Sequence, residues 1–184
     1  RIPAEIPFAK AAPLLCAGIT LYSPLKRWGA GPGKKVAIIG MGGLGHVGVQ
    51  IAAKMGAEVV VISQTMSKKD DGLRFGASDY YATSEPERLR ELRGSLDLMV
   101  STVAAVADLD AMLKLLKPGG VLVDVGLPEH ASTLRLSSLT NGNKVLAGSQ
   151  IGGIAETQEV LDFCAANGVV PQVEIISGED ITAA

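Results

Sequence analysis

The stretch KVAIIGMGGLGHVGVQ, residues 35–50, joins a block of apolar residues to a helix-like pattern through a turn rich in glycine. Each glycine costs backbone entropy when the chain orders, so a turn that uses Gly40, Gly42, Gly43 and Gly45 needs a physical reason. The spacing Gly40-x-Gly42-x-x-Gly45, between a predicted strand and a predicted helix, is typical of dinucleotide-binding βαβ units. In such units the first glycine makes the turn, the second lets the backbone approach a pyrophosphate, and the third allows close packing of helix and strand. We therefore predict a dinucleotide site at the N-terminus of the helix.

Apolar runs of strand length alternate with helix-length stretches from residue 34 onward, which is typical of a parallel sheet built from βαβ units. Hydrophobic residues make up 47% of the chain and aromatic residues only 4%, as expected for a sheet covered by helices on both faces. We expect an α/β fold with a Rossmann, doubly wound, parallel six-stranded sheet in the order 3-2-1-4-5-6. The predicted strands are 35–40, 58–63, 79–82, 96–101, 120–126 and 144–149, and the predicted helices are 43–55, 67–75, 85–93, 106–116 and 153–166.

Prolines divide the first part of the chain around one helix-length stretch, so we interpret residues 1–33 as a lead-in segment. Residues 34–168 form the expected dinucleotide-binding domain. Residues 169–184 are expected to begin the return of the chain to another domain. The chain starts at Arg1 without a methionine, and its last residues open like a helix and stop after one turn. We therefore expect a piece of a longer protein.

Charge and composition narrow the classes of partner. The formal net charge is −2 without a long run of lysine and arginine, so we expect no nucleic-acid partner. We find no stretch of about 18 apolar residues and expect no membrane partner. The two cysteines, Cys16 and Cys164, are too few for a disulfide framework, which favours a reducing, cytoplasmic compartment. Small molecules are therefore the expected class of partner.

The end of the second predicted strand, VVVISQTMSKKD, indicates which dinucleotide binds. An NAD site places Asp or Glu there for the ribose 2′-hydroxyl, whereas this chain has Ser63, Gln64 and Thr65. A carboxylate would repel a 2′-phosphate, while hydroxyls, an amide and Lys68 or Lys69 would bind one. The sequence thus predicts NADP(H), although the same lysines would suit a solvated first turn of helix. The missing acid also argues against a methyltransferase.

Several stretches resemble one family, the zinc-dependent medium-chain dehydrogenases, and within it the cinnamyl alcohol dehydrogenase branch. The resemblance is carried by AAPLLCAGITLYSPLKRWGAGPGKKVAIIGMGGLGHVGVQIAAKMGAEVVVIS and continues in LDLMVSTV, LKPGGVLVDVGLPE and GSQIGG, covering about residues 10–176. It implies an NADP(H)-dependent, zinc-containing alcohol dehydrogenase that mostly reduces aldehydes by hydride transfer and forms homodimers. Most of the family's GroES-like catalytic domain has no counterpart here, so we expect this chain by itself to bind cofactor without catalysis.

The resemblance also implies roles for individual residues. Cys16 matches the cysteine that completes the catalytic zinc site, although from sequence alone it would be a buried, unliganded thiol. One cysteine cannot hold a catalytic zinc, which takes about three protein ligands. Of the two histidines, His46 is expected to pack and His130 to be solvated. The implied cofactor-binding residues are Thr20 beside the nicotinamide, Gly42, Gly43 and Leu44 at the pyrophosphate, Ser63, Thr65 and Lys68 at the 2′-phosphate, Thr102 and Val103 after the fourth strand, Val125 and Gly126 at the end of the fifth, and Ser149 and Ile151 after the sixth.

Two other classes of function stay open. A zinc-free NADPH quinone reductase relative would use the same sheet and cofactor but would not need Cys16, so metal analysis of the intact protein separates the two. A non-enzymatic dinucleotide-sensing module is the third class, and turnover by the whole protein would exclude it.

Overall fold

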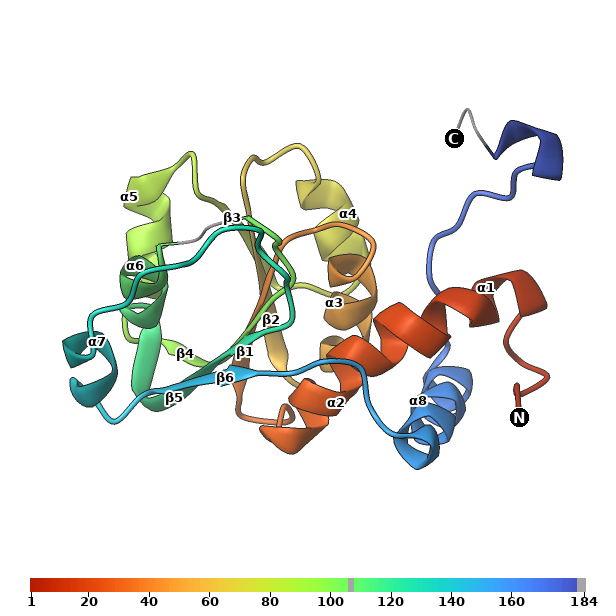
Figure 1. The fold of residues 1–184 in the computed structure, drawn as a ribbon, viewed down its shortest axis with the longest axis horizontal. Helices are drawn as coiled ribbons and strands as arrows, with labels where there is room; N and C mark the ends of the chain where they lie inside the picture. The colour runs from red at the N-terminus through yellow and green to blue at the C-terminus, as the bar shows by residue number, and fades with distance from the viewer. Residues whose placement is uncertain (106–107, 182–184) are drawn as a thin grey trace.

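A computed structural model describes residues 1–105 and 108–181 of the chain. Six parallel strands form one sheet in the order β3-β2-β1-β4-β5-β6, which confirms the predicted fold class and strand order (Figure 1). The order reverses between β1 and β4, and in open α/β sheets ligands bind outside the carboxyl ends of the strands at this place. The strands are β1 Lys35–Ile39, β2 Glu58–Ser63, β3 Asp79–Ala82, β4 Leu96–Ser101, β5 Leu116–Asp124 and β6 Val145–Gly148.

Helices cover both faces of the sheet. Figure 1 shows α3 and α4 on one side of the strands and α5 and α6 on the other, with α2 and α8 beside the sheet. The helices are α1 Phe8–Pro13, α2 Ile19–Arg27, α3 Gly45–Lys54, α4 Lys69–Arg74, α5 Pro86–Leu89, α6 Leu109–Leu113, α7 Ser137–Thr140 and α8 Ile154–Asn167, with a π-helical turn at Leu14–Gly18 and 3₁₀ turns at Arg90–Leu92 and Gly178–Asp180.

The apolar run of β1 is explained by burial on both faces. Val36 and Ile38 belong to the larger hydrophobic core, under α2, α3 and α8, whereas Ala37 and Ile39 belong to the smaller core on the opposite face. Successive side chains of a strand point to opposite faces. An apolar residue is therefore needed at every position of a central parallel strand.

Most element boundaries differ from the sequence-based expectation by one or two residues, and the differences at β5 and α6 are larger. Strand β5 starts at Leu116 rather than residue 120, because Leu96 pairs with Leu116 before the register shifts to pair Leu98 with Val121. The helix expected at 106–116 is Leu109–Leu113 in the described part of the chain, and residues 106–107 lie outside it. The short helix α7 was not predicted.

The segment Phe8–Arg27 is one helical stretch of 20 residues that is long and apolar enough to cross a membrane, by length and composition only, which we did not expect from the sequence. Over its most apolar 18 residues, 56% is buried within the fold. Leu14, Leu21 and Leu25 lie in the larger hydrophobic core, and the stretch packs against α3 and α8. Its apolar side chains are thus used in packing the domain.

Candidate cofactor site

The glycine turn between β1 and α3 has two positions that accept only glycine. Gly40 has a φ of +94°, and a Cβ there would lie 2.6 Å from Thr102 Oγ1. A Cβ at Gly45 would lie 1.9 Å from the carbonyl oxygen of Gly40. Both glycines are therefore required by the packing of the turn, whether or not a ligand is bound.

Gly42 and Gly43 are different, because a Cβ at either position would meet nothing within 4 Å. Packing does not explain these two glycines. The missing side chains leave open space in front of the backbone, next to the start of α3 at Gly45. A helix N-terminus offers unpaired N–H groups and a partial positive charge, so this space suits a phosphate group.

A pocket of about 740 Å³ opens at the carboxyl ends of β1 and β2, beside the turn. Its size suits a small-molecule ligand. It brings together seven of the residues predicted from the sequence, which come from the turn, from the end of β2 and the loop after it, and from the segment that follows β4. These are Gly40, Gly42, Ser63, Gln64, Thr65, Lys68 and Val103.

The loop after β2 presents hydroxyl groups and a cation to this pocket. Thr65 Oγ1 and Ser67 Oγ lie 2.9 Å apart, and the ammonium group of Lys68 donates a hydrogen bond of 3.1 Å to the carbonyl oxygen of Met41. This contact holds Lys68 over the glycine turn. An anion in the pocket would meet donors from both the turn and the loop.

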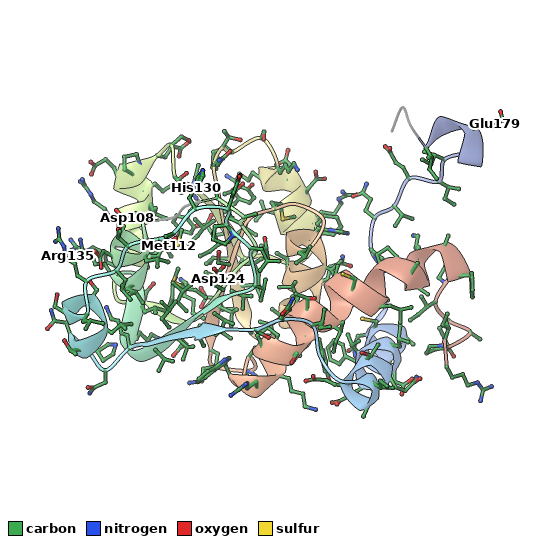
Figure 2. All side chains as sticks on the ribbon, viewed as in Figure 1. Asp108, Met112, Asp124, His130, Arg135 and Glu179 are labelled. Atoms are coloured by element: carbon green, nitrogen blue, oxygen red, sulfur yellow. The ribbon has the colours of Figure 1, made fainter. Side chains whose placement is uncertain are left out.

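Parts of the pocket wall come from distant segments of the chain and were not predicted from the sequence. Leu89, Met112 and Leu115 give it an apolar side, and Thr83 follows β3. Asp108 also lines it, and its carboxylate caps α6 by accepting the Ala111 N–H at 2.9 Å. Figure 2 shows Asp108 and Met112 together at α6. Thr83 could have been found from its place at a strand end, whereas nothing local marks the apolar wall.

The remaining predicted residues lie outside this pocket, and their roles stay predictions. Thr20 is buried in α2. Thr102 donates through Oγ1 to the Ile39 carbonyl at 2.8 Å. Leu44 immediately precedes α3, and the Ile151 backbone has a φ of +44°. After β5 and β6 the backbone N–H groups of Val125 and Ser149 donate to Ser101 and Asp124, and Gly126 lies so close to Val103 that a Cβ would be 2.2 Å from its carbonyl oxygen.

The described residues of this chain do not by themselves form a zinc site. Cys16 is exposed on the π-helical turn. Across residues 1–105 and 108–181, no group of three His, Cys, Asp or Glu side chains could hold a metal ion. Cys164 is buried, and burial raises the pKa of its thiol to about 12, so this cysteine packs as an apolar side chain.

Comparison with known proteins agrees with this geometry. The family model for zinc-binding dehydrogenases matches residues 43–166. NADP-dependent alcohol dehydrogenase C 1 of Mycolicibacterium smegmatis is 58% identical over 184 residues, which are 100% of this chain and 53% of that protein. A cinnamyl alcohol dehydrogenase structure from Sorghum bicolor is 36% identical with a TM-score of 0.96, and that of CAD from Helicobacter pylori complexed with NADP(H) is 42% identical with a TM-score of 0.89. This chain is fully covered in both and spans 52% of each, so it has about half the length of these relatives.

Proposed function

Since this chain belongs to the zinc-binding dehydrogenase family, in the cinnamyl alcohol dehydrogenase branch of the medium-chain dehydrogenases, we propose that it is the NADP(H)-binding part of an alcohol dehydrogenase. The observation that carries the proposal is the pocket in which an open glycine turn faces a loop of hydroxyl groups and a lysine. When bound, the nicotinamide cofactor supplies or accepts the hydride that interconverts aldehydes and alcohols. Aldehyde reduction is the proposed main direction.

The proposed pyrophosphate position lies in front of Gly42 and Gly43, where a Cβ at either residue would have no protein neighbour within 4 Å. The backbone N–H groups at the start of α3 donate to the phosphate oxygens there. Gly40 and Gly45 hold the turn in shape, since neither position has room for a side chain. The turn thus binds by its backbone, and its glycines divide into two that shape it and two that leave room.

The 2′-phosphate is proposed to bind to Ser63, Thr65 and Lys68, with Gln64 beside them. The Lys68 ammonium group has three N–H donors. One donates to the Met41 carbonyl oxygen, so two remain for a phosphate. The adenine ring is proposed to lie against the apolar wall that includes Leu89 and Met112. The loop therefore selects NADP(H) over NAD(H) by charge.

The wider proposal concerns the whole protein. Cys16 is a zinc ligand there, with further ligands supplied from outside this chain, and this chain alone binds cofactor without turnover. Residues 1–33 are the lead-in segment from the catalytic domain, 34–168 the NADP-binding Rossmann domain and 169–184 the start of the return. The protein is a cytoplasmic homodimer that acts on a small alcohol or aldehyde.

Calorimetric titration of the chain with NADPH and with NADH, at one salt concentration, tests the cofactor site. We expect tighter binding of NADPH. Ser63→Asp should weaken NADPH binding by at least about tenfold more than NADH binding, because the new carboxylate repels the 2′-phosphate. Ser132→Asp adds the same charge on an exposed loop outside the pocket and should leave both affinities unchanged. Equal losses for both cofactors in Ser63→Asp would refute the assignment of the loop.

A further inference from the structure

His46, in the first turn of α3, is hydrogen-bonded through both nitrogens of its ring. Nδ1 lies 3.2 Å from the carbonyl oxygen of Gly42, and Nε2 lies 3.0 Å from the backbone nitrogen of Gln172. The carbonyl can only accept a hydrogen bond and the backbone N–H can only donate one. Both contacts therefore require the same tautomer, a neutral ring with its proton on Nδ1 and a lone pair on Nε2.

The two partners of His46 belong to different parts of the fold. Gly42 lies in the glycine turn, four residues before His46, and Gln172 lies 126 residues after it. Gln172 ends the return segment, defined here as residues 169–172, which follows α8. Gln50, one turn along α3, makes a second connection by donating to the carbonyl oxygens of His46 at 3.1 Å and Val170 at 3.2 Å. His46 thus connects the glycine turn to the return segment, and Gln50 connects α3 itself to that segment.

We propose that His46 is a positioning residue which, as its Nδ1–H tautomer, links the glycine turn to the return segment, and that protonation of Nε2 breaks the link at Gln172. An imidazole side chain changes charge between about pH 5 and 8. The imidazolium carries a hydrogen on Nε2 that would face the Gln172 N–H, so the acceptor is lost. The bond from Nδ1–H to Gly42 remains. Any change in NADPH affinity when the link is altered rests on the proposed function, whereas the link between His46 and Gln172 does not.

The charged groups around the ring do not compensate for that loss. The Phe75 ring lies 5.6 Å from the His46 ring, and the Arg74 guanidinium lies 4.9 Å from the Phe75 ring and 3.5 Å from Gln172 Oε1. Arg74 is paired with Asp71 at 2.6 Å. In the described part of the chain no carboxylate is in ion-pair contact with His46. The nearby cation Lys68 donates to the Met41 carbonyl oxygen and not to the His46 ring. Protonation therefore removes the Gln172 contact without creating an ion pair in its place.

Two substitutions each keep one of the two His46 hydrogen bonds and remove the other, and neither introduces a group that changes charge with pH. In His46→Asn the amide nitrogen takes the place of Nδ1 and keeps the donor to Gly42, but it cannot reach Gln172. In His46→Gln the amide oxygen reaches the position of Nε2 and accepts from Gln172, but the donor to Gly42 is lost. His130, the other histidine of the chain, lies on an exposed loop (Figure 2). His130→Gln therefore leaves His46 as the single histidine of the chain.

Nuclear magnetic resonance of the 184-residue His130→Gln chain tests the link directly. At pH 7.5 we expect the ring ¹⁵N shifts of His46 to show a protonated Nδ1 and a bare Nε2. Between pH 7.5 and 5.5 the exchange protection of the Gln172 amide, corrected for intrinsic rate, should fall about fivefold, the factor that one net hydrogen bond contributes. With His46→Gln added, protection should stay within about twofold over this range, and with His46→Asn it should be low at both pH values. An Nε2–H tautomer, or protection at Gln172 that does not change with pH in the His130→Gln chain, overturns the proposal.

NADPH titration of the same variants tests the effect on the cofactor site. His46→Gln, without the donor to Gly42, should weaken NADPH binding about fivefold, and His46→Asn should stay within about twofold of the His130→Gln chain. The opposite order would overturn the positioning role of the Nδ1 contact. If no variant, nor the His130→Gln chain, binds NADPH, the proposed function fails while the exchange data still decide whether the link exists.

Discussion

Replacing Gly45 with alanine should destabilise the chain strongly through a single backbone contact. A Cβ at this position would lie 1.9 Å from the Gly40 carbonyl oxygen and 2.9 Å from the carbonyl carbon, where ordinary contact begins at 3.4 Å. The start of α3 and the end of β1 must therefore separate by roughly 1.5 Å. Overpacking costs about 1–3 kcal/mol, and the backbone oxygen cannot rotate away as a side chain would. We expect a loss of about 3 kcal/mol in the free energy of unfolding, or a fall of about 6–12 °C in Tm for a chain of this size.

Gly43→Ala is the matched control, since its Cβ would meet nothing within 4 Å and its φ is not positive. Its free energy of unfolding should stay within about 0.5 kcal/mol of the original chain. The added methyl group would project into the proposed pyrophosphate position, so NADPH binding should weaken by at least about tenfold. Urea unfolding followed by circular dichroism, together with calorimetric titration, measures both properties. Unfolding of Gly45→Ala at the original midpoint would contradict the predicted clash with the Gly40 carbonyl, and unchanged NADPH binding by Gly43→Ala would contradict the proposed pyrophosphate position.

Three further substitutions test the packing and electrostatics of the fold. Tyr80→Phe should raise the free energy of unfolding by about 1 kcal/mol in thermal melts, because the buried Tyr80 hydroxyl has no hydrogen-bond partner among the described residues; a loss of stability would contradict this. Asp97→Asn should cost about 1–3 kcal/mol at pH 7. Burial raises the pKa of the Asp97 carboxyl, but hydrogen bonds from the Lys35 N–H and the Lys117 ammonium group lower the pKa by more, so the folded pKa lies below the ordinary value. The stabilisation is complete above the unfolded pKa and is lost as the pH falls through the lower folded value, so urea midpoints of the two proteins should converge below about pH 4; a constant difference down to pH 2 would refute it. Glu159→Gln should cost under about 1 kcal/mol, because its contact with Lys26 is an exposed pair and the amide oxygen of Gln can still accept from the Tyr22 hydroxyl; a larger loss in urea unfolding would contradict this.

Much of the sheet was predictable because its strands are encoded locally. KVAII and EVVVIS are short, rich in Val and Ile and apolar at nearly every position, a pattern typical of a strand buried on both faces. The start of β5 was not predictable, since Pro118, Gly119 and Gly120 look like a turn and become part of a strand only through the pairing of Leu96 with Leu116. Local pattern therefore predicted the central strands, and partner strands decided where β5 begins.

The same division holds for the candidate site. The sequence by itself determined the glycine turn and the polar loop after β2, because each lies within a few residues and each follows from backbone conformation or charge. Only the tertiary structure decided that Leu89 and Met112 line the same pocket as that loop and that His46 binds Gln172. These contacts join residues far apart in the chain, and side chains at such separations are brought together by the packing of whole helices on the sheet. No local periodicity specifies which of them meet.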